Sequence, residues 1–444
     1  MKLCLIAPDL RTLGGYELQL TALVTGLAEA GHAVHLFVRD GVDPQHPYWR
    51  AICGSGVVAH TTPRWLRAIT PIRFGEKRWA TRLVDCLMPL WNVLALPLAS
   101  VQRRSRARTV QAIAGVVHGW LNQLAHIDPQ QWWMNRQLDW LWLQAAPDLV
   151  DIQHSMIPAG FRYARRRGVP LIYTEYGAPN RELLSVWLPM RDLVNQADLV
   201  MGRADASISG LRELCNLRDD MPTVIVPNAV TTAPTDDRAT ALPTAETVTM
   251  MAIGRISAEK APLTLLSAFK TAHTQHPHAR LIYAGDGPLR PQLEQQVAAL
   301  DLQGAVQITG RFDSLPPLIQ QADFVVHPTL NDGRSVAVLE AMAWGRAVVG
   351  TRVGGVAELV EDGVTGRLVA PNDAAQLADG LCQLVADRAL REQMGQAARA
   401  HFLQGAFSAE AMVAKTLETY QRVLLQQPQP KLRRVEPSTF HASF

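Results

Sequence analysis

Strand-like and helix-like patterns alternate along almost the whole chain, and they do so in two separate halves. Near the N-terminus, an apolar run over residues 2–8 is followed by a glycine loop, by apolar residues at helical spacing, and by a second apolar run over 34–38. The second half repeats this plan, with runs over 248–255 and 279–287. Because parallel strands need helical crossovers, the pattern predicts an α/β chain with two Rossmann-like domains.

Eight further apolar runs of strand length continue the rhythm. In the first half they cover residues 148–153, 170–176, 197–202 and 223–228, and in the second half 305–311, 323–329, 347–351 and 366–370.

Composition along the chain predicts where the domains divide. A polar stretch rich in Pro and Thr over 231–246 has the character of a linker, so we expect an N-terminal domain over 1–230 and a C-terminal domain over 247–407. A last helical pattern covers 408–427, and the polar, Pro-containing tail 428–444 predicts disorder.

Residues 60–145 interrupt the alternation with a mostly helical pattern, which predicts a helical insertion in the first domain. Eight of the eleven tryptophans lie in it, and residues 60–110 contain ten Lys or Arg against two Asp or Glu. Tryptophan and arginine together favour a peripheral membrane surface that faces anionic lipid. A helical subdomain with an aromatic core and solvated arginines explains the same composition.

Charge, cysteine usage and hydropathy exclude several classes of protein. The net charge of +3 does not indicate a nucleic-acid partner. Five scattered cysteines contain no CxxC pair, so neither a zinc site nor a disulfide framework is expected. The opening apolar run is too short for a signal peptide, and the uncharged run 86–102 is broken by Pro89 and Pro97. A cytoplasmic location is expected, and binding at the inner face of the membrane is the alternative that the Trp-rich composition of residues 60–145 adds.

Two cations flank a predicted helix start in the second domain. A strand ends at Gly254 and Arg255, Lys260 follows in the loop, and Pro262 opens an apolar helix. Strand carboxyl ends form the ligand-binding edge of parallel sheets, and free helix amides together with two cations suit a diphosphate. Ordinary surface cations remain an alternative explanation.

A second loop follows the run 323–329. Asp332 lies in it, Ser335 is a plausible N-cap, and Glu340 follows among apolar neighbours, where a carboxylate more often has a dedicated partner. Asp332 is placed to approach a transferred sugar, and Glu340 to bind ribose hydroxyls. The four residues whose amides lie near the helix start, where a phosphate can bind, are Gly333, Arg334, Ser335 and Val336.

The order and spacing of these residues resemble the family 4 retaining glycosyltransferases, whose hallmark is Glu-x7-Glu beside an Arg/Lys pair. The resemblance covers the chain outside residues 60–145 and implies a GT-B fold, a nucleoside-diphosphate sugar donor (UDP- or GDP-sugar), retention of anomeric configuration and no required metal or other cofactor. The motifs that carry it are Gly14-Gly15, Gly254-Arg255 with Lys260, Gly285-Asp286-Gly287-Pro288, Pro328 before Asp332, and Glu340-Ala341-Met342-Ala343 before Gly345.

The resemblance also implies roles for single residues. Arg255 and Lys260 neutralise the leaving diphosphate, Gly15 lets the first-domain backbone approach it, and Glu340 holds the ribose. Gly254 and Gly285 belong to the same donor site. The chain departs from the family pattern where Asp332 replaces the usual Glu, where Arg334 and Ser335 replace Phe and Gly, and where Ala261 replaces Gly, which puts the identity of the donor sugar in question.

His154 is the catalytic candidate of the first domain. It follows the run 148–153, where family members often have a His-x-His pair, and Asp151 and Gln153 occupy those two places. At this edge a histidine can contact the donor sugar or the acceptor hydroxyl, and a structural loop histidine is the alternative. Glu175 and Tyr176, at the next strand end, are candidates for the acceptor side.

The expected function is transfer of a sugar to a glycan, lipid-linked or small-molecule acceptor, with Asp332, His154, Arg255 and Lys260 as the catalytic set. A silent paralogue that binds sugar nucleotides or scaffolds polysaccharide assembly is the main alternative, based on Asp332 and the missing His-x-His. A sugar-nucleotide epimerase is an enzyme alternative. A dehydrogenase is more distant, since the run 285–290 lacks the third glycine of GxGxxG.

Overall fold

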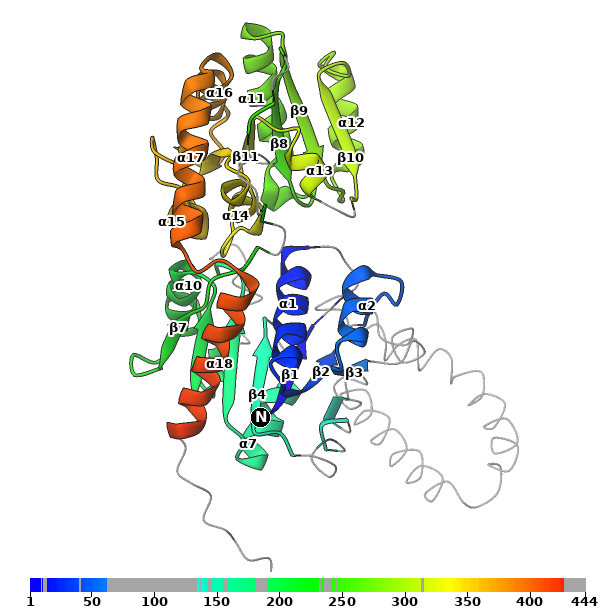
Figure 1. Cartoon of the computed structure of the whole chain (residues 1–444), viewed down its shortest axis with the longest axis vertical. Coiled ribbons are helices and arrows are strands. Elements are labelled where there is room, and N and C mark those ends of the chain that lie inside the picture. Colours follow the sequence, from blue (N-terminus) through cyan, green and yellow to red (C-terminus); the bar gives the residue numbers. More distant parts are fainter. Residues whose placement is uncertain are drawn as a thin grey trace, which may run out of the picture.

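Two α/β domains, each built on one parallel sheet, make up the described part of the chain (Figure 1). This computed structural model describes residues 1–8, 10, 14–39, 41–61, 134–135, 137–139, 141, 146–154, 158–179, 191–230, 233–234, 241–243, 246–312 and 315–426. Most of residues 60–145, most of the predicted linker 231–246 and the tail 428–444 lie outside these residues. The predictions made for them therefore stay predictions.

The first sheet has the strand order β3-β2-β1-β4-β5-β6-β7, and every neighbouring pair is parallel. This order reverses between β1 and β4, the kind of position at which open α/β sheets bind ligands. Its strands are β1 (Lys2–Ala7), β2 (Ala33–Val38), β3 (Val58–Thr61), β4 (Leu149–Gln153), β5 (Leu171–Glu175), β6 (Leu199–Gly202) and β7 (Thr223–Ile225). The helices described with it are α1 (Gly15–Glu29), α2 (Pro47–Gly54), α7 (Pro158–Arg167), α9 (Arg191–Val194) and α10 (Asp205–Cys215).

The second sheet has the order β10-β9-β8-β11-β12-β13 and is also parallel throughout. Its strands are β8 (Val248–Ile253), β9 (Ala279–Ala284), β10 (Val306–Gly310), β11 (Phe324–His327), β12 (Ala347–Thr351) and β13 (Gly366–Val369). The helical segments are η4 (Ala258–Lys260), α11 (Pro262–Gln275), α12 (Arg290–Ala299), α13 (Pro316–Ile319), α14 (Val336–Ala343), α15 (Gly354–Leu359), α16 (Ala374–Ala386), α17 (Arg388–Gln404) and α18 (Ala409–Gln426). All twelve apolar runs identified in the sequence form strands, which confirms the prediction of two parallel-sheet domains.

Strand β1 is buried on both faces of the first sheet, which explains its continuous apolar sequence after Lys2. Successive residues of β1 point to opposite faces, so Leu3 and Leu5 join a cluster with Leu20 of α1, while Cys4 and Ile6 join the cluster on the other face. Burying each such side chain contributes about 1.5–3 kcal/mol.

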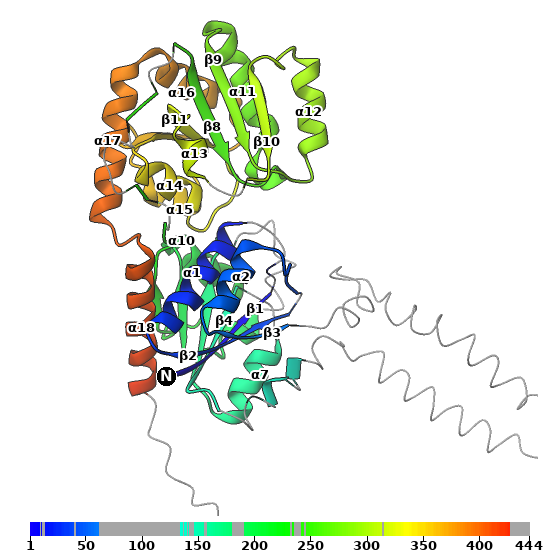
Figure 2. The same ribbon diagram turned by 45° about the vertical axis from the view of Figure 1, so that its right-hand side comes forward.

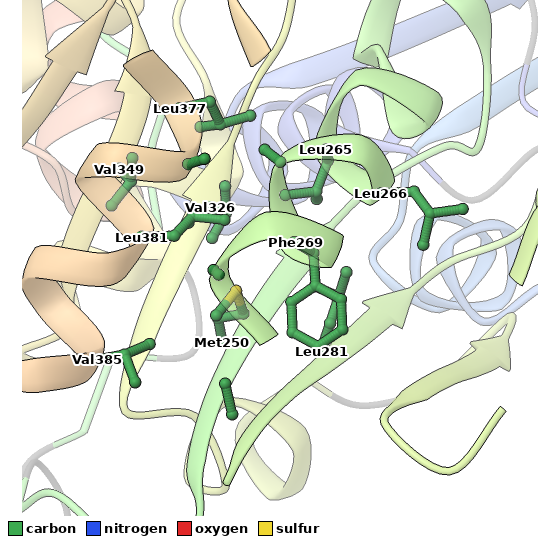
Figure 3. Packing of buried hydrophobic residues seen from close by; sticks show 14 of the residues in the cluster. Met250, Leu265, Leu266, Phe269, Leu281, Val326, Val349, Leu377, Leu381 and Val385 are labelled. Atoms are coloured by element: carbon green, nitrogen blue, oxygen red, sulfur yellow. The ribbon is translucent and has the colours of Figure 1, made fainter. Parts of the chain in front are cut away.

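The second domain packs in the same way. Figure 3 shows Leu265 and Phe269 of α11 over Met250 and Leu281 of the sheet, with Leu381 of α16 beside them. Because α11 is fixed by this packing, the loop that precedes it and carries Lys260 has a rigid support.

Helix α18 belongs by sequence to the end of the second domain but lies along the first (Figures 1 and 2). The chain crosses where the Val230 amide donates to the Phe407 carbonyl oxygen at 2.8 Å. Val413 of α18 then packs against α1, and the Tyr420 hydroxyl donates to the buried Asp151 carboxylate at 2.6 Å. The two domains are thus joined twice, before β8 and after α17.

The carboxyl edges of the two sheets face each other. The Asn228 side-chain amide, beyond β7, donates to the Arg334 carbonyl oxygen, beyond β11, at 2.7 Å. Gly333 lies so close to Tyr176 that a Cβ atom there would clash with the Tyr176 carbonyl oxygen. Only glycine fits at position 333 when the domains are in this arrangement.

Strand β3 was not among the strands expected from the sequence. His60 and Thr61, assigned there to the start of the helical segment, belong to this strand, and Val58 in it is 47% exposed. An edge strand with one open face has a weaker apolar pattern than a central strand, which is why the pattern did not predict it. None of the described helices is long and apolar enough to span a membrane.

Candidate active site

The cationic loop of the second domain connects β8 to α11. Gly254 directly follows β8 with φ of 136°, η4 ends at Lys260, and α11 begins at Pro262 as predicted. Between them Ala261 adopts a left-handed conformation with φ of 45°. Such a conformation costs a non-glycine residue about 1–2 kcal/mol, which explains why glycine is the more usual residue at this position.

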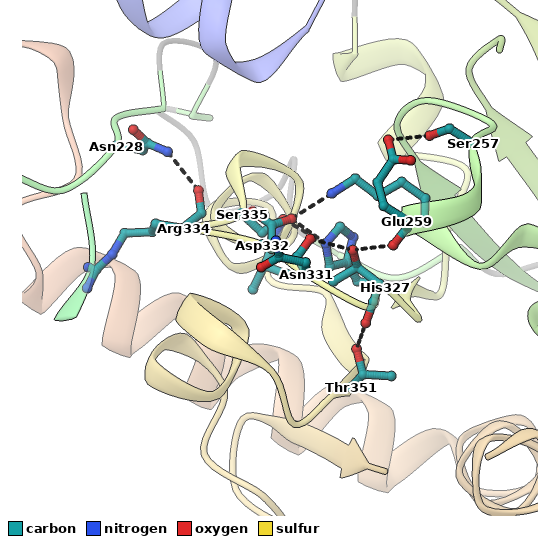
Figure 4. Close-up of polar contacts among 12 residues, drawn as sticks. Asn228, Ser257, Glu259, His327, Asn331, Asp332, Arg334, Ser335 and Thr351 are labelled. Atoms are coloured by element: carbon teal, nitrogen blue, oxygen red, sulfur yellow. Dashed lines mark hydrogen bonds and ion pairs between the residues drawn. The ribbon is translucent and has the colours of Figure 1, made fainter. Parts of the chain in front are cut away.

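Lys260 reaches across to the loop after β11. Its ammonium group lies 2.7 Å from Asp332 Oδ2, and His327 Nε2, on the last residue of β11, lies 2.9 Å from the same oxygen (Figure 4). His327 Nε2 is also 3.1 Å from the Ser335 hydroxyl. Ser335 accepts from the Val338 amide and caps α14, so the predicted N-cap is confirmed.

The electrostatics of this group favour a charged aspartate. Burial acts to raise the pKa of Asp332, but the Lys260 ammonium and the His327 hydrogen bond outweigh it, and the pKa lies well below its ordinary range. Burial and the nearby Lys260 lower the pKa of His327 despite its bond to Asp332. We infer that His327 is neutral and donates its Nε2 proton to Asp332.

Glu340 is buried in α14 with 8% of its surface exposed. No described residue donates a hydrogen bond to its carboxylate, and burial raises its pKa to about 8. Burial, together with the charges of Glu340 and Glu17, raises the pKa of Tyr48 to about 12. Tyr48 and Glu17 belong to the first domain. The Glu340 carboxylate of the second domain therefore lies close enough to act electrostatically on a residue of the first.

The two arginines predicted for the donor site differ in where they lie. Arg255 is exposed at the end of β8 and lines a small pocket with Lys260 and His327. The Arg334 guanidinium turns away from Asp332 and pairs with Glu358 of α15 at 2.9 Å. The structure thus brings the Arg334 backbone, not its charge, to the loop around Asp332.

The glycines predicted for the site lie at strand ends and at the domain interface. A Cβ atom on Gly15, at the start of α1, would be 3.2 Å from Val336 at the start of α14. Gly285 follows β9 and packs against the backbone of Gly254. At both places the neighbouring atoms leave little room for a Cβ atom, which explains the choice of glycine.

His154 directly follows β4 with a left-handed φ of 42°. Its Nδ1 lies 2.6 Å from Glu175 Oε1, and the Gly177 amide donates to the same oxygen at 2.6 Å. The Tyr173 hydroxyl donates to Glu175 Oε2 at 2.7 Å. The Tyr16 ring lies 5.8 Å from the imidazole, measured between ring centroids. Glu175 thus fixes the orientation of the His154 ring.

The His154–Glu175 pair favours the imidazolium form. Burial acts to lower the pKa of His154, but the Glu175 carboxylate outweighs it and the pKa is raised. Burial acts to raise the pKa of Glu175, and the His154 charge and hydrogen bond reverse this, so the pKa is lowered. Gly177 lies between His154 and Gly333, which connects this pair to the loop of the second domain.

Polar side chains inside the first sheet support this edge. The Thr174 hydroxyl donates to Asp151 at 2.8 Å, and burial raises the pKa of Asp151 to about 6. The Tyr176 hydroxyl donates to Gln153 at 2.7 Å, and the fully buried Arg203 guanidinium stacks 4.2 Å from the Tyr176 ring centroid.

Sequence reasoning missed two contributors to the site, Arg203 and His327. His327 carried a usable signal, a polar residue at the last position of an apolar strand on the ligand-binding edge. Arg203 carried a weaker one, since its buried position depends on packing from several strands.

Cavities and metal ligands add little to this picture. A cavity of about 280 Å³ lies at the opposite, amino edge of the second sheet, lined by Thr249, Arg280 and Gln307 among others. It is remote from the charged groups described above. Within the described ranges, no cluster of three or more His, Cys, Asp or Glu side chains could hold a metal ion.

Comparison with known proteins gives a family for the second domain. Residues 247–387 match the family model described as Glycosyl transferases group 1. This segment contains the Lys260–Asp332 pair and Glu340.

Curated relatives are glycosyltransferases. The chain is 35% identical over 146 residues to alpha-D-kanosaminyltransferase of Streptomyces kanamyceticus, covering 32% of this chain and 38% of that protein. It is 27% identical over 353 residues to D-inositol 3-phosphate glycosyltransferase of Corynebacterium urealyticum, covering 74% and 80%. In three of the strongest matches, the aligned part spans only 38–40% of the relative's length.

A solved structure extends the similarity to both domains. The crystal structure of Anabaena HepE in complex with UDP-glucose superimposes with a TM-score of 0.68 at 18% identity, covering 95% of this chain and 100% of that one. At this identity the likeness shows the fold. Residues 247–387 therefore match a Glycosyl transferases group 1 domain, and the two-sheet fold of the chain is that of the Anabaena HepE structure.

Proposed function

We propose that this chain transfers a sugar from a UDP-sugar to a hydroxyl group of a glycan, lipid-linked or small-molecule acceptor, with retention of anomeric configuration and without a required metal ion. The observation that carries the proposal is the Lys260–Asp332 ion pair at the ligand-binding edge of the group 1 domain. UDP is favoured as the nucleotide because Anabaena HepE, which shares the fold, was crystallised with UDP-glucose.

On the donor side, Arg255 and Lys260 supply the positive charge that a departing diphosphate requires. Lys260 is 27% exposed and its partner Asp332 is 14% exposed, so a ligand can reach the pair. When a diphosphate binds, Lys260 shares its donors between Asp332 and the phosphate, and the α14 amides add dipolar stabilisation. Glu340 accepts hydrogen bonds from the ribose, which supplies the partners its buried carboxylate lacks.

On the acceptor side, His154 and Asp332 approach the sugar from opposite domains. The acceptor oxygen forms a bond to the anomeric carbon while the bond from that carbon to the diphosphate oxygen breaks. The acceptor proton passes to the departing phosphate on the same face, as is usually proposed for the family that this chain resembles. His154, held by Glu175 through Nδ1, hydrogen-bonds the sugar or acceptor hydroxyls through Nε2.

Nucleotide binding and product stereochemistry test this proposal. Thermal shifts are measured with UDP, GDP and ADP and their sugars in EDTA, and an acceptor panel is then screened with the stabilising donor. The anomeric coupling constant of the purified product, measured by proton NMR, reports the configuration. Stabilisation by UDP and a product with the donor's configuration are expected.

Each part of the proposal fails on a different result. Selective stabilisation by GDP would show that the donor nucleotide is GDP and not UDP. A requirement for added Mg²⁺ would contradict the proposal that no metal ion is needed. An inverted product would overturn retention. Tight donor binding with no turnover on any acceptor would favour the silent paralogue instead.

A further inference from the structure

Helix α10 in the first domain begins without a side-chain cap of its own. Its N-cap, Ala204, has an extended backbone and no oxygen to offer, which leaves the first amides of the helix without partners. Glu358 of the second domain supplies them. Its Oε1 accepts from the Ala206 amide at 2.9 Å, and its Oε2 accepts from the Asp205 amide at 3.2 Å. The cap of this helix therefore comes from the other domain.

The same carboxylate is paired with Arg334. The guanidinium lies 2.9 Å from Glu358 Oε2, and the two side chains are only 10% and 23% exposed. Positive charge from Arg334 and the positive end of the α10 dipole both stabilise the carboxylate. We call the group of Glu358, Arg334 and the Asp205 and Ala206 amides the Glu358 bridge.

The Glu358 bridge is continuous with the proposed donor site. Arg334 lies two residues after Asp332, and its carbonyl oxygen accepts from the Asn228 side chain at 2.7 Å. Helix α15, which carries Glu358, begins against the same loop, where the Gly355 amide donates to the Asp332 carbonyl oxygen at 3.1 Å. A change at Glu358 is therefore transmitted to Asp332 through a few residues.

We infer that Glu358 and Arg334 are positioning residues that lock the loop over residues 332–335 when the two domains close. This inference rests on the proposed function. Helices α10 and α15 belong to different domains, so the bridge exists only in the closed arrangement and shifts the equilibrium toward it. Closure and correct placement of Asp332 are then a single event, and the open enzyme leaves the loop without this restraint.

Hydrogen exchange of single amides measures the bridge without turnover. With saturating UDP, the Asp205 and Ala206 amides of the wild-type protein are expected to exchange slowly. Glu358→Ala is expected to accelerate both by about fivefold or more, the effect of losing a helix cap of about 1 kcal/mol. Glu392→Ala, which removes an exposed carboxylate of α17, is the matched control and leaves both rates unchanged.

A second variant separates closure from simple helix stability. Ala204→Ser gives α10 a local cap, so Glu358→Ala with Ala204→Ser regains the melting temperature lost by Glu358→Ala alone. Turnover is expected to stay about tenfold below wild type in this double variant, with UDP affinity within about threefold, because the domain contact is still missing. Full recovery of kcat would show that Glu358 only stabilises α10, and would overturn the inference.

The exchange experiment also distinguishes the two levels of proposal. If UDP protects no amide between Gly254 and Lys260 in the wild type, the proposed donor site fails. If UDP protects that loop normally and Glu358→Ala leaves Asp205 and Ala206 unchanged, only the bridge fails.

Discussion

The two sides of the domain interface are built in different ways. On the second-domain side, charged groups lie in loops at strand ends, as in the Lys260–Asp332 pair, and remain partly exposed. On the first-domain side, the polar groups belong to the strands themselves. Asp151 and Glu175 have no exposed surface, and His154, which Glu175 holds, has 36% of its side chain exposed. The second-domain side has partly exposed charged groups, and the first-domain side holds the His154 imidazole in a fixed orientation.

In the proposed reaction, each side of the interface stabilises a different chemical group. A diphosphate carries formal charge and requires cations and helix amides that it can reach. An acceptor hydroxyl is neutral and gains more from a ring held at a fixed angle. Glu175 fulfils this condition because its three hydrogen bonds, from His154, Tyr173 and Gly177, leave it one orientation.

The comparison predicts that variants on the two sides fail in different ways, and the largest effect is expected at Lys260. Lys260→Ala removes one of the two cations of the proposed diphosphate site and leaves the Asp332 carboxylate without its ammonium partner. We expect kcat/KM to fall about 10²–10³-fold, the range found when a transition-state donor is removed, together with loss of UDP binding. Steady-state kinetics and calorimetric titration with UDP measure both.

Lys415→Ala is the control for Lys260. Lys415 lies exposed on α18 and pairs with Glu418, so its removal tests the loss of a lysine away from the interface. If Lys260→Ala binds UDP with wild-type affinity, the diphosphate does not bind at Lys260, and the proposed role of the second-domain side is wrong.

On the first-domain side, His154→Ala is expected to separate binding from turnover. We expect kcat to fall about 10–10²-fold, while the UDP dissociation constant changes by less than about threefold, because the imidazole acts on the sugar or acceptor. Binding is measured by titration and turnover by product formation. Equal loss of UDP binding in His154→Ala and Lys260→Ala would erase the distinction between the two sides.

The same contrast explains what the sequence could predict. Local patterns predicted the two parallel sheets, the helix start at Pro262 and the N-cap Ser335. Strand ends, proline and capping residues influence only the few residues next to them in the chain, so their effect can be read from the sequence. Arg255 and Lys260 were recognisable as two cations of one loop, because both follow directly after a strand.

Non-local features escaped this reasoning. Arg203 was not identified, because a buried arginine is defined by neighbours from distant strands rather than by its own spacing. The exposed edge strand β3 lacked the apolar pattern of a central strand. Arg334 was assigned through its loop position, while its guanidinium is committed to Glu358, a partner that only tertiary structure reveals.

The next prediction concerns Glu340, whose replacement by Gln is expected to stabilise the fold and to weaken UDP binding. Its pKa of about 8 lies above the ordinary 4.5, so the folded protein holds a proton that the unfolded chain releases between these pH values. Stability therefore falls as pH rises through this window, and Glu340→Gln removes the penalty. We expect the unfolding free energy to rise by about 1–3 kcal/mol at pH 8 and to stay unchanged near pH 4.5, while UDP affinity falls.

Urea unfolding at the two pH values measures this effect, with Glu392→Gln on the exposed face of α17 as the control. A stability loss in Glu340→Gln at pH 8 would mean that the carboxylate already has a partner in the protein, and would place the ribose elsewhere.

The smallest expected effect concerns the ionisation of His154. The Glu175 carboxylate raises the pKa of this imidazole against the effect of burial, so the pair stabilises the fold fully below pH 6.5 and ceases to do so as pH rises through the raised pKa. Glu175→Gln removes the largest contribution that raises this pKa and leaves burial opposed by Glu17, so the pKa is expected to fall. A side-chain NMR titration of His154 in both proteins measures the shift, with Tyr173→Phe as a control that removes a donor to Glu175 but keeps its charge. An unchanged midpoint in Glu175→Gln would mean that Glu175 orients the ring without setting its charge.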